Sequence, residues 1–388
     1  MFEPHGSKAR VRLRTVGGET WDVVVTDGTA RAGPPSGAAD AILSSDATTW
    51  RSIAGNRGDG VQAYLTGNLL VRQNLQVGIG FLAATRSRNS SGRLRFRTVR
   101  TRRAGLSIVE CGSGPAIVTI HGLGGTKASF LPTVVALGQR FRVIAVDLPG
   151  FGDSDKPIGA SYDARFFADS VVDLLDALGI DRAHVIGNSL GGRVALEIGL
   201  SHPDRVDRLV LLCPSLAWLR DRTLVPLVRL ARPELALVQP APRPVFRAIV
   251  PRLVPGATRG WVAVGVDEFL RAYFHRGGRV AFYAAARQIY LEEPHGKRGF
   301  WSRLRGLEAD SLFVWGHRDR LVPKAFARHV SDALPASRHL ELDCGHVPQI
   351  ERPHQTHAAV VEFLLDAALD PSRAAVSDRS IPRRVAVG

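Results

Sequence analysis

Residues 185–196 read VIGNSLGGRVAL, and they place Ser189 between two glycines that each lie two positions away. The apolar run before the serine is typical of a buried strand, and the residues after it are typical of a helix. A sharp turn from strand to helix strains its central residue, and side chains two positions away would collide with neighbouring backbone. Gly187 and Gly191 remove that collision, so the spacing predicts a turn that points the Ser189 hydroxyl out at the edge of a sheet.

The serine belongs to a longer pattern in which short apolar runs alternate with amphipathic segments. The runs expected to be strands are residues 116–122, 141–147, 183–188, 208–213, 311–316 and 338–343, and residues 162–179 are expected to form a helix. Such alternation predicts an α/β fold with a mostly parallel sheet and helices on both faces. Ligands of these sheets bind at the carboxyl ends of the strands, so the chemistry is expected just after each strand.

A serine hydroxyl is a weak nucleophile and needs a base. His346, in DCGHVPQ, follows the last expected strand, and Asp319, in FVWGHRDRLVP, follows the one before it. The aspartate would orient the imidazole and stabilise it once protonated. Asp343 is a rival acid, three residues before the histidine. His317 and Cys344 could suggest a metal site with His346, but this grouping lacks a recognised ligand spacing.

Acyl transfer also needs two backbone amides that hold a developing oxyanion. The amide of Leu190 would lie at a helix N-terminus, where the helix dipole favours an anion. The loop IHGLGGTKASF (120–130) directly follows an expected strand, and its glycines allow close approach of the backbone. The amide of Leu123 is the second candidate, with Gly124 as the near alternative, and His121 is expected to brace the loop.

The passages HGLGG, DLPGFGDSDKP, GNSLGG, WGHRDRLVP and CGHVPQ stand in the order and spacing of the α/β-hydrolase superfamily, which residues 104–368 resemble. The resemblance implies an α/β-hydrolase fold, with Ser189 as nucleophile, Asp319 as acid and His346 as base. It implies no metal and no cofactor. A serine at the nucleophile position, where some members carry aspartate, implies acyl transfer to water.

The alternation is interrupted by an insert at residues 215–305, which divides the expected core into residues 104–214 and 306–368. The insert is rich in Pro, Arg, Leu and Val, and its segments 224–238, 244–254 and 260–274 are expected to form short helices of a lid above the sheet. It carries 16 Lys and Arg against 6 Asp and Glu. Its arginines and apolar faces could contact an anionic membrane surface, as interfacial helices do.

Residues 1–85 follow a different pattern, in which strands and helices come in separate runs. Strands are expected at 11–16, 20–28 and 39–46, helices at 46–56 and 58–67, and a strand with an apolar segment at 68–84. The pattern predicts a small α+β domain. The passages ADAILSSDATTWRSIAGN and AYLTGNLLVRQN resemble a sterol-carrier-protein-2 type lipid-binding domain, which implies lipid binding. The alternative is an accessory domain that only packs against its neighbour.

Residues 86–103 contain eight arginines. Arg93, Arg95 and Arg97 alternate with apolar residues, which indicates a linker followed by an edge strand with one solvated face. The segment lacks aromatic platforms for single-stranded nucleic acid, so no nucleic-acid partner is expected despite the net charge of +15. Residues 369–388 form a polar tail that is expected to be disordered.

The chain has three widely separated cysteines and no CxxC pair, which favours a reducing, cytoplasmic setting. The first residues lack the apolar core of a signal peptide, and no apolar stretch of about 18 residues predicts a membrane span. The expectation is therefore a cytoplasmic protein that can also associate with a membrane surface.

Three functions agree with these features. The first is hydrolysis of an ester with an apolar, lipid-like acyl group, which the apolar lid and the first domain favour. The second is hydrolysis of a carbon–carbon bond in ring-fission products, because GNSLGG and CGH are similar to that family, although Val347 stands where those enzymes usually carry Trp. The third is a lipid carrier whose hydrolase domain is secondary.

Overall fold

The computed structural model describes residues 8–26, 29–55, 60–84, 94–218, 225–238 and 260–366 of the 388-residue chain. Its larger domain is built on an eight-stranded sheet in the order β13-β12-β11-β10-β8-β9-β7-β6. The strands are β6 (Arg95–Arg100), β7 (Gly105–Cys111), β8 (Ala116–Ile120), β9 (Arg142–Val146), β10 (Ala183–Asn188), β11 (Val206–Leu212), β12 (Ser311–Gly316) and β13 (Arg338–Leu342). Each strand expected from 116 onward is present to within two residues at either end, and β7 is an addition.

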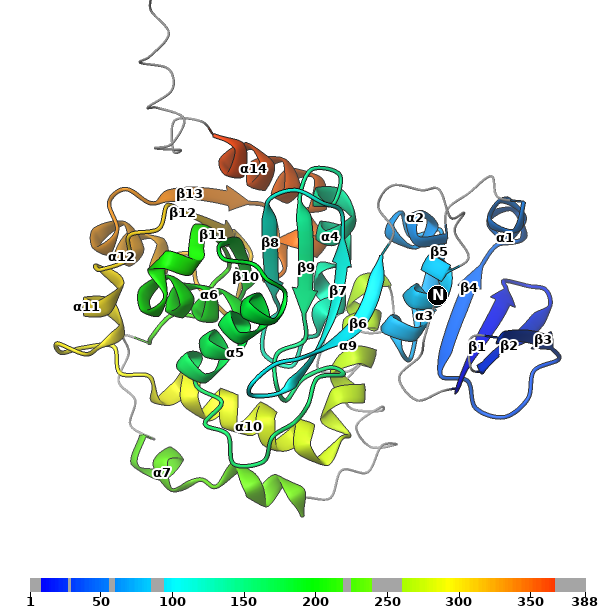
Figure 1. Cartoon of the computed structure of the whole chain (residues 1–388), viewed down its shortest axis with the longest axis horizontal. Helices are drawn as coiled ribbons and strands as arrows, with labels where there is room; N and C mark the ends of the chain where they lie inside the picture. The colour runs from blue at the N-terminus through cyan, green and yellow to red at the C-terminus, as the bar shows by residue number, and fades with distance from the viewer. Residues whose placement is uncertain are drawn as a thin grey trace, which may run out of the picture.

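The sheet is mostly parallel, with antiparallel pairing only where β7 meets β6 and β9. Helices cover both faces (Figure 1). α5 (Ala164–Ala177), α6 (Leu190–Ser201) and α12 (Phe326–Ala333) share one apolar cluster with it, and α4 (Leu131–Leu137) and α14 (Pro353–Leu365) share the other. Neighbouring residues such as Val185 and Ile186 are buried in opposite clusters. Burial on both sides explains why these strands read as continuous apolar runs.

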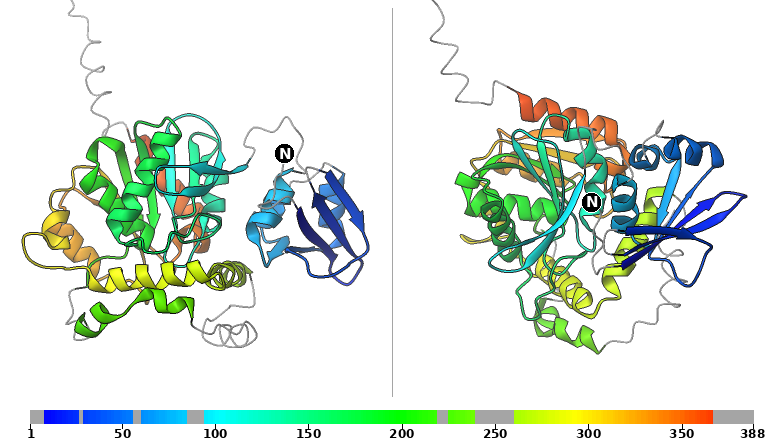
Figure 2. Two further views of the ribbon diagram at one scale, coloured as in Figure 1. Left: turned by 60° about the horizontal axis from the view of Figure 1, so that its bottom comes forward. Right: turned by 45° about the vertical axis from the view of Figure 1, so that its right-hand side comes forward.

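The insert between β11 and β12 forms helices at one end of the sheet. They are α7 (Val225–Leu230), the 3-10 helix η3 (Pro233–Leu237), α9 (Gly260–Tyr273), α10 (Arg276–Leu291) and α11 (Phe300–Leu304). α10 crosses beneath the core, and α7 lies on its outer side (Figure 2). The long helix α10 was not anticipated from the sequence, and the segment expected at 244–254 lies outside the described residues.

The smaller domain has a five-stranded sheet in the order β3-β2-β1-β4-β5. Its elements are β1 (Lys8–Thr15), β2 (Thr20–Thr26), β3 (Thr29–Gly33), β4 (Ala41–Ser45), α1 (Ala47–Ala54), α2 (Gly60–Leu65), β5 (Leu69–Arg72) and α3 (Leu75–Ala84). The expected hairpin forms around Gly17 and Gly18, and Asp46 caps α1 by accepting a hydrogen bond from the amide of Thr49 at 2.8 Å. β3 is the one described strand of this domain that the sequence did not suggest.

α3 joins the two domains because it is apolar on all sides. Leu75, Ile79 and Leu82 are almost fully buried. They belong to the same apolar cluster as Phe130 and Val134 of the larger domain. α3 lies on the side of the small sheet that faces the larger domain (Figures 1 and 2). A helix with apolar residues on every side must be covered on every side. The small sheet covers one side of α3, and the larger domain covers the other.

Two expected surface segments can be placed only in part. β6 occupies the edge of the large sheet and pairs with β7 alone, whereas residues 85–93 lie outside the described part of the chain. The predicted tail at 369–388 also lies outside it. Within the described residues, no helix is long and apolar enough to cross a bilayer.

Candidate active site

Ser189 lies at the sharp turn between β10 and α6. Its backbone has φ 56° and ψ −118°, a conformation that residues with side chains rarely adopt. A Cβ atom on Gly187 would lie 2.1 Å from the carbonyl oxygen of Gly191, and one on Gly191 would lie 2.0 Å from that of Ile120. Neither contact is possible for real atoms, so the turn depends on both glycines.

The loops after β12 and β13 bring Asp319 and His346 together. Nδ1 of His346 lies 2.7 Å from Oδ2 of Asp319, whose side chain is fully buried. Oδ1 of the same carboxylate accepts hydrogen bonds from the amides of Leu321 (2.8 Å) and Val322 (3.0 Å). Burial acts to raise the pKa of Asp319, but the hydrogen bond and charge of His346 and the two amides outweigh it, so this pKa is lowered. The ionised carboxylate therefore holds the proton on Nδ1, which leaves Nε2 free to act as a base.

Two side chains fix the loop that carries His346. The side-chain amide of Asn188 donates to the carbonyl oxygens of His346 (3.0 Å) and Leu212 (2.9 Å). Glu351 accepts hydrogen bonds from the amides on both sides of the histidine, those of Gly345 and Val347. The sequence interpretation missed both residues. The position of Asn188 beside the serine was an available signal, whereas nothing in the sequence pattern distinguishes Glu351.

The serine and the histidine are brought to the same end of the sheet. No hydrogen bond joins the Ser189 hydroxyl to His346 among the residues that the structure describes. Hydrogen bonds of this kind are often long in enzymes without substrate and shorten when substrate binds. Asp319 thus orients the imidazole of His346 at the end of the sheet that carries Ser189.

The loop after β8 lies directly against the nucleophile. A Cβ atom on Gly122 would lie 3.1 Å from Cβ of Ser189. His121 braces this loop, because its Nε2 accepts a hydrogen bond from the amide of Leu148 (3.1 Å) while its Nδ1 lies 2.8 Å from the carbonyl oxygen of Gly122. Burial lowers the pKa of His121, which favours the neutral ring that these two contacts require.

Two backbone amides are available near Ser189. Leu190 is the first residue of α6, so its amide has no partner within the helix. In the described part of the chain, the amide of Leu123 donates to no other group. The alternative, Gly124, has φ +72°. The candidate amides thus lie on the two segments that meet at the nucleophile, as an oxyanion site requires.

Aromatic side chains of the lid cover the same loop. A Cβ atom on Gly124 would lie 2.7 Å from Cδ2 of Phe269 and 3.3 Å from Cε2 of Phe282. The rings of Phe269, on α9, and Phe282, on α10, meet edge to face with centroids 5.5 Å apart, and Tyr273 stacks on Phe269 at 5.5 Å. The loop therefore borders an apolar, aromatic wall.

The other candidate residues lie apart from this arrangement. Asp343, the rival acid, is 70% exposed and pairs with Arg318 at 3.0 Å. His317 is exposed beside Lys324 and Glu341. Neither contacts the serine or the histidine in the described residues.

Potential ligand atoms of Cys213, Asp319 and His346 lie within 4.8 Å of one another. Burial and the nearby Asp319 raise the pKa of the Cys213 thiol, so it stays neutral and is a poor metal ligand. Asp319 and His346 already bond to each other. The group therefore fits a hydrogen-bonded pair beside a neutral thiol better than it fits a metal site.

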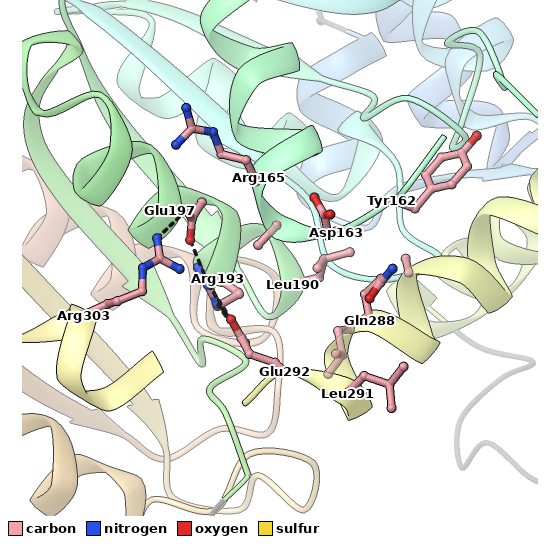
Figure 3. A pocket seen from close by; sticks show the side chains of 13 residues that line it. Tyr162, Asp163, Arg165, Leu190, Arg193, Glu197, Gln288, Leu291, Glu292 and Arg303 are labelled. Carbon is pink, nitrogen blue, oxygen red and sulfur yellow. Dashed lines mark hydrogen bonds and ion pairs between the residues drawn. The ribbon is translucent and has the colours of Figure 1, made fainter. Parts of the chain in front are cut away.

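A polar pocket of about 230 Å³ lies beside Leu190, between α6, α10 and the start of α5 (Figure 3). Arg193 of α6 contacts Glu197 at 2.8 Å and also pairs with Glu292, just after α10. Arg303 of α11 donates to Glu197 at 2.5 Å. These paired charges attach the helix that follows the nucleophile to the lid.

Comparisons with known proteins agree with this fold. Residues 115–353 match the family model described as the alpha/beta hydrolase fold. The chain belongs to this family. The match begins beyond the small domain, so the resemblance of residues 1–85 to the sterol-carrier family stays a prediction.

Individual relatives differ in what their names describe. The chain is 46% identical over 118 residues to the uncharacterized protein Rv2715 of Mycobacterium tuberculosis, and the match spans 30% of this chain and 34% of that protein. It is 29% identical over 291 residues to the 2-hydroxymuconate semialdehyde hydrolase of Pseudomonas sp. strain CF600, covering 66% of this chain and 89% of the relative. A bacterial membrane phospholipase A superposes with a TM-score of 0.54 at 30% identity, covering 70% of this chain and 86% of that one.

Proposed function

We propose that the protein hydrolyses esters of apolar, lipid-like acyl groups through Ser189. The observation that carries this proposal is the aromatic wall of Phe269 and Phe282 on the loop beside the nucleophile. An acyl chain placed there loses contact with water, and burial of apolar surface favours its binding. The similarity to a membrane phospholipase A supports the same substrate class.

The proposed reaction uses the residues in the positions described. The Ser189 hydroxyl attacks the ester carbonyl while Nε2 of His346 takes its proton, and Asp319 stabilises the imidazolium. The amides of Leu123 and Leu190 hold the oxyanion. His346 then gives the proton to the leaving alcohol, which leaves an acyl-enzyme. Water, activated by the same histidine, attacks this ester, releases the carboxylic acid and restores the serine.

A carbon–carbon hydrolase is the second candidate, and the similarity to 2-hydroxymuconate semialdehyde hydrolase favours it. The same serine and histidine would then act on a vinylogous ketone rather than an ester. Ring-fission substrates carry carboxylates, which an enzyme must bind with cations. Lys127, which is buried, and Arg271, which is half-buried, already pair with Asp147 and Asp153 respectively, which favours the ester.

Nitrophenyl esters from acetyl to palmitoyl, and a ring-fission dienone, separate these functions. Wild type is expected to cleave the longer esters fastest, and Ser189→Ala should lower kcat by about 10⁴-fold or more, since it removes the nucleophile. Ser201→Ala, at the other end of α6, is the matched control and should keep full activity. Faster cleavage of the dienone than of any ester would make the carbon–carbon reaction the function. A co-purifying stoichiometric lipid that Ser189 does not turn over would favour the carrier.

A further inference from the structure

The turn between β5 and α3 binds two carboxylates of the lid helix α9. Nε of Arg72 lies 2.6 Å from Oδ2 of Asp267, and its Nη2 lies 3.2 Å from Oδ1. The amide of Gln73 donates to the same carboxylate at 3.0 Å. The amide of Leu75 donates to Oε1 of Glu268 at 2.7 Å. An arginine that makes two hydrogen bonds to one carboxylate fixes the relative orientation of the two side chains and also pairs their charges. The small domain therefore holds α9 at two successive residues, Asp267 and Glu268.

The conformation of the turn serves this contact. Gln73 has φ 74°, in the left-handed region that residues with side chains rarely occupy. Asn74 caps α3 by accepting a hydrogen bond from the amide of Val77 at 3.1 Å. Leu75 is the first residue of α3, so the helix dipole adds to the attraction between its amide and Glu268. A strained backbone such as that of Gln73 persists only where the surrounding contacts hold it. The strain therefore indicates that the exact position of this turn against α9 is important.

A buried ion network continues from α9 to the loops of the active site. Glu268, which is 4% exposed, also accepts a hydrogen bond from Arg271 at 2.9 Å. Arg271 in turn donates to Asp153 at 2.6 Å. Lys127 lies 3.4 Å from Asp153 and donates to Gln76 of α3. The small domain thus contacts this network from two of its residues, Leu75 and Gln76.

The residue that follows Glu268 is Phe269, whose ring lies on Gly124 of the loop beside Ser189. We propose that the small domain is a positioning module for the lid. The Arg72–Leu75 turn holds α9 in place, and α9 holds Phe269 against the loop, so that the turn sets the length of acyl chain that the enzyme accepts. The choice of acyl substrates rests on the proposed function, whereas the hold on α9 rests on the contacts alone.

Hydrogen exchange tests the hold on α9 without any substrate. In Arg72→Gln, amides of α9 are expected to exchange at least tenfold faster than in wild type, while those of α14 keep their rates. Arg72→Lys, which retains the charge, should recover part of the protection. Arg182→Gln is the matched control, because Arg182 pairs with Asp207 at the end of β10 away from Ser189. Unchanged exchange of α9 in Arg72→Gln would overturn the proposal, whatever the enzyme hydrolyses.

Kinetics on short and long esters test the consequence for the site. Arg72→Gln and Asp267→Asn should each raise KM for a long-chain ester about five- to thirtyfold, with kcat on the acetyl ester unchanged. The double variant should lose no more than Asp267→Asn alone, because that single change already weakens both the Arg72 pair and the Gln73 hydrogen bond. Labelling of Ser189 by a small fluorophosphonate should keep its wild-type rate. If the variants lost activity equally on short and long esters, the contact between Arg72 and Asp267 would be merely structural. That result would refute the positioning role.

A second, independent observation concerns the outer surface of the lid. Leu227 and Leu230 of α7 are 67% and 78% exposed, and Leu235 and Val238, in and just after η3, are 65% and 80% exposed. This α7–η3 surface lies on the side of α10 that faces away from the sheet (Figure 2). Large apolar side chains clustered on one exposed segment indicate a surface that binds an apolar partner.

The charge and the shape of the α7–η3 surface indicate which partner it binds. An open, mainly apolar groove of about 510 Å³ separates α7 and η3 from α10, lined in part by Tyr283 and Tyr290. Arg229 and Arg232 are exposed within the α7–η3 surface, against one acid, Glu234. Basic residues beside apolar ones suit lipid phosphates above acyl chains. We infer that the α7–η3 surface docks on an anionic bilayer.

Flotation with vesicles tests this docking. Wild type is expected to float with phosphatidylglycerol vesicles and much less with phosphatidylcholine vesicles. Replacing Leu227 and Leu230 by Ser should reduce binding about tenfold or more, and replacing Arg229 and Arg232 by Gln should remove the preference for anionic lipid. Val16→Ser, an exposed apolar residue of the small domain, is the control. Absence of wild-type binding to anionic vesicles, or full binding by the leucine variant, would overturn the inference.

Discussion

Nδ1 of His346 lies 2.7 Å from Oδ2 of Asp319, although 27 residues separate them in the chain. The carboxylate is buried, and the amides of Leu321 and Val322 hold its other oxygen. Asp319→Asn keeps the shape of the side chain but removes the charge and favours the wrong tautomer of His346. We expect kcat to fall by about 10⁴-fold with little change in folding, measured on the best ester substrate.

The control for this change is Asp343→Asn. Asp343 is exposed and pairs with Arg318, so its replacement should leave kcat within about twofold of wild type. The reverse result, with loss at Asp343 and not at Asp319, would assign the acid to the rival residue.

The glycines of the turn give a second prediction. Gly191→Ala would place a methyl group 2.0 Å from the carbonyl oxygen of Ile120, so we expect an insoluble or inactive protein. In Gly265→Ala, in α9, no atom of the described residues lies within 4 Å of the new methyl group. It should be neutral or raise the free energy of unfolding by about 1 kcal/mol, since alanine favours a helix. Urea denaturation compares the free energies of unfolding of the two variants. A stable, active Gly191→Ala would refute the steric argument.

Acid should weaken the packing of α14 on α4. Nε2 of His357 lies 3.0 Å from the hydroxyl of Thr133, and burial, with a smaller contribution from His354, lowers the pKa of His357 to about 4. The folded protein therefore binds this proton less readily than the unfolded chain, whose histidine has a pKa of about 6.5. The stabilisation is full above pH 6.5 and is lost as the pH falls through about 4, by up to about 3 kcal/mol.

Equilibrium unfolding between pH 7 and pH 4, with His357→Gln beside wild type, measures this contribution. The variant keeps a polar partner for Thr133 but does not titrate, so its stability should fall less steeply with acid. Parallel curves for the two proteins would mean that His357 makes no such contribution.

The contact between α6 and the end of α10 gives a fourth prediction. Arg193 is almost fully buried, with its guanidinium between Glu197 and Glu292 and 4.9 Å from the ring centroid of Phe300. Glu292→Gln would remove one of its two carboxylate partners, and we expect a loss of about 3 kcal/mol of stability. Glu293→Gln, at the neighbouring exposed position, is the control. Thermal unfolding compares the two, and equal melting temperatures would contradict the importance of this pair.

Much of the fold could be predicted because its signals are local. The run before Ser189 and the runs before Asp319 and His346 are continuous and apolar, as strands buried on both faces must be, and each forms a strand. The helix α10 was missed because its inner face is made largely of small residues such as Ala281 and Ala285, so the segment has no apolar run that draws attention. β3 was missed because it is short and mostly exposed, and the small alanines of its sequence give little apolar signal.

The residues of the candidate site also fall into two groups, those that the sequence indicated and those that it did not. Ser189, Asp319 and His346 follow strands, so their order along the chain indicated their meeting at one end of the sheet. The contacts of Glu351 with the histidine loop and of Arg72 with α9 depend on how distant segments pack. A single sequence contains no local signal for such pairings, since a charged residue on a surface loop has the same neighbours in the chain whether or not it has a partner in space.

The burial of α3 between the small sheet and the larger domain has a consequence for anyone who shortens this chain. A fragment that begins near residue 94 would retain every strand of the family match, yet it would lose α3, whose Leu75, Ile79 and Leu82 belong to the same apolar cluster as Phe130 and Val134. Such a fragment should aggregate or require detergent, however complete its catalytic residues are. In this molecule the boundary between the domains is a shared apolar interior.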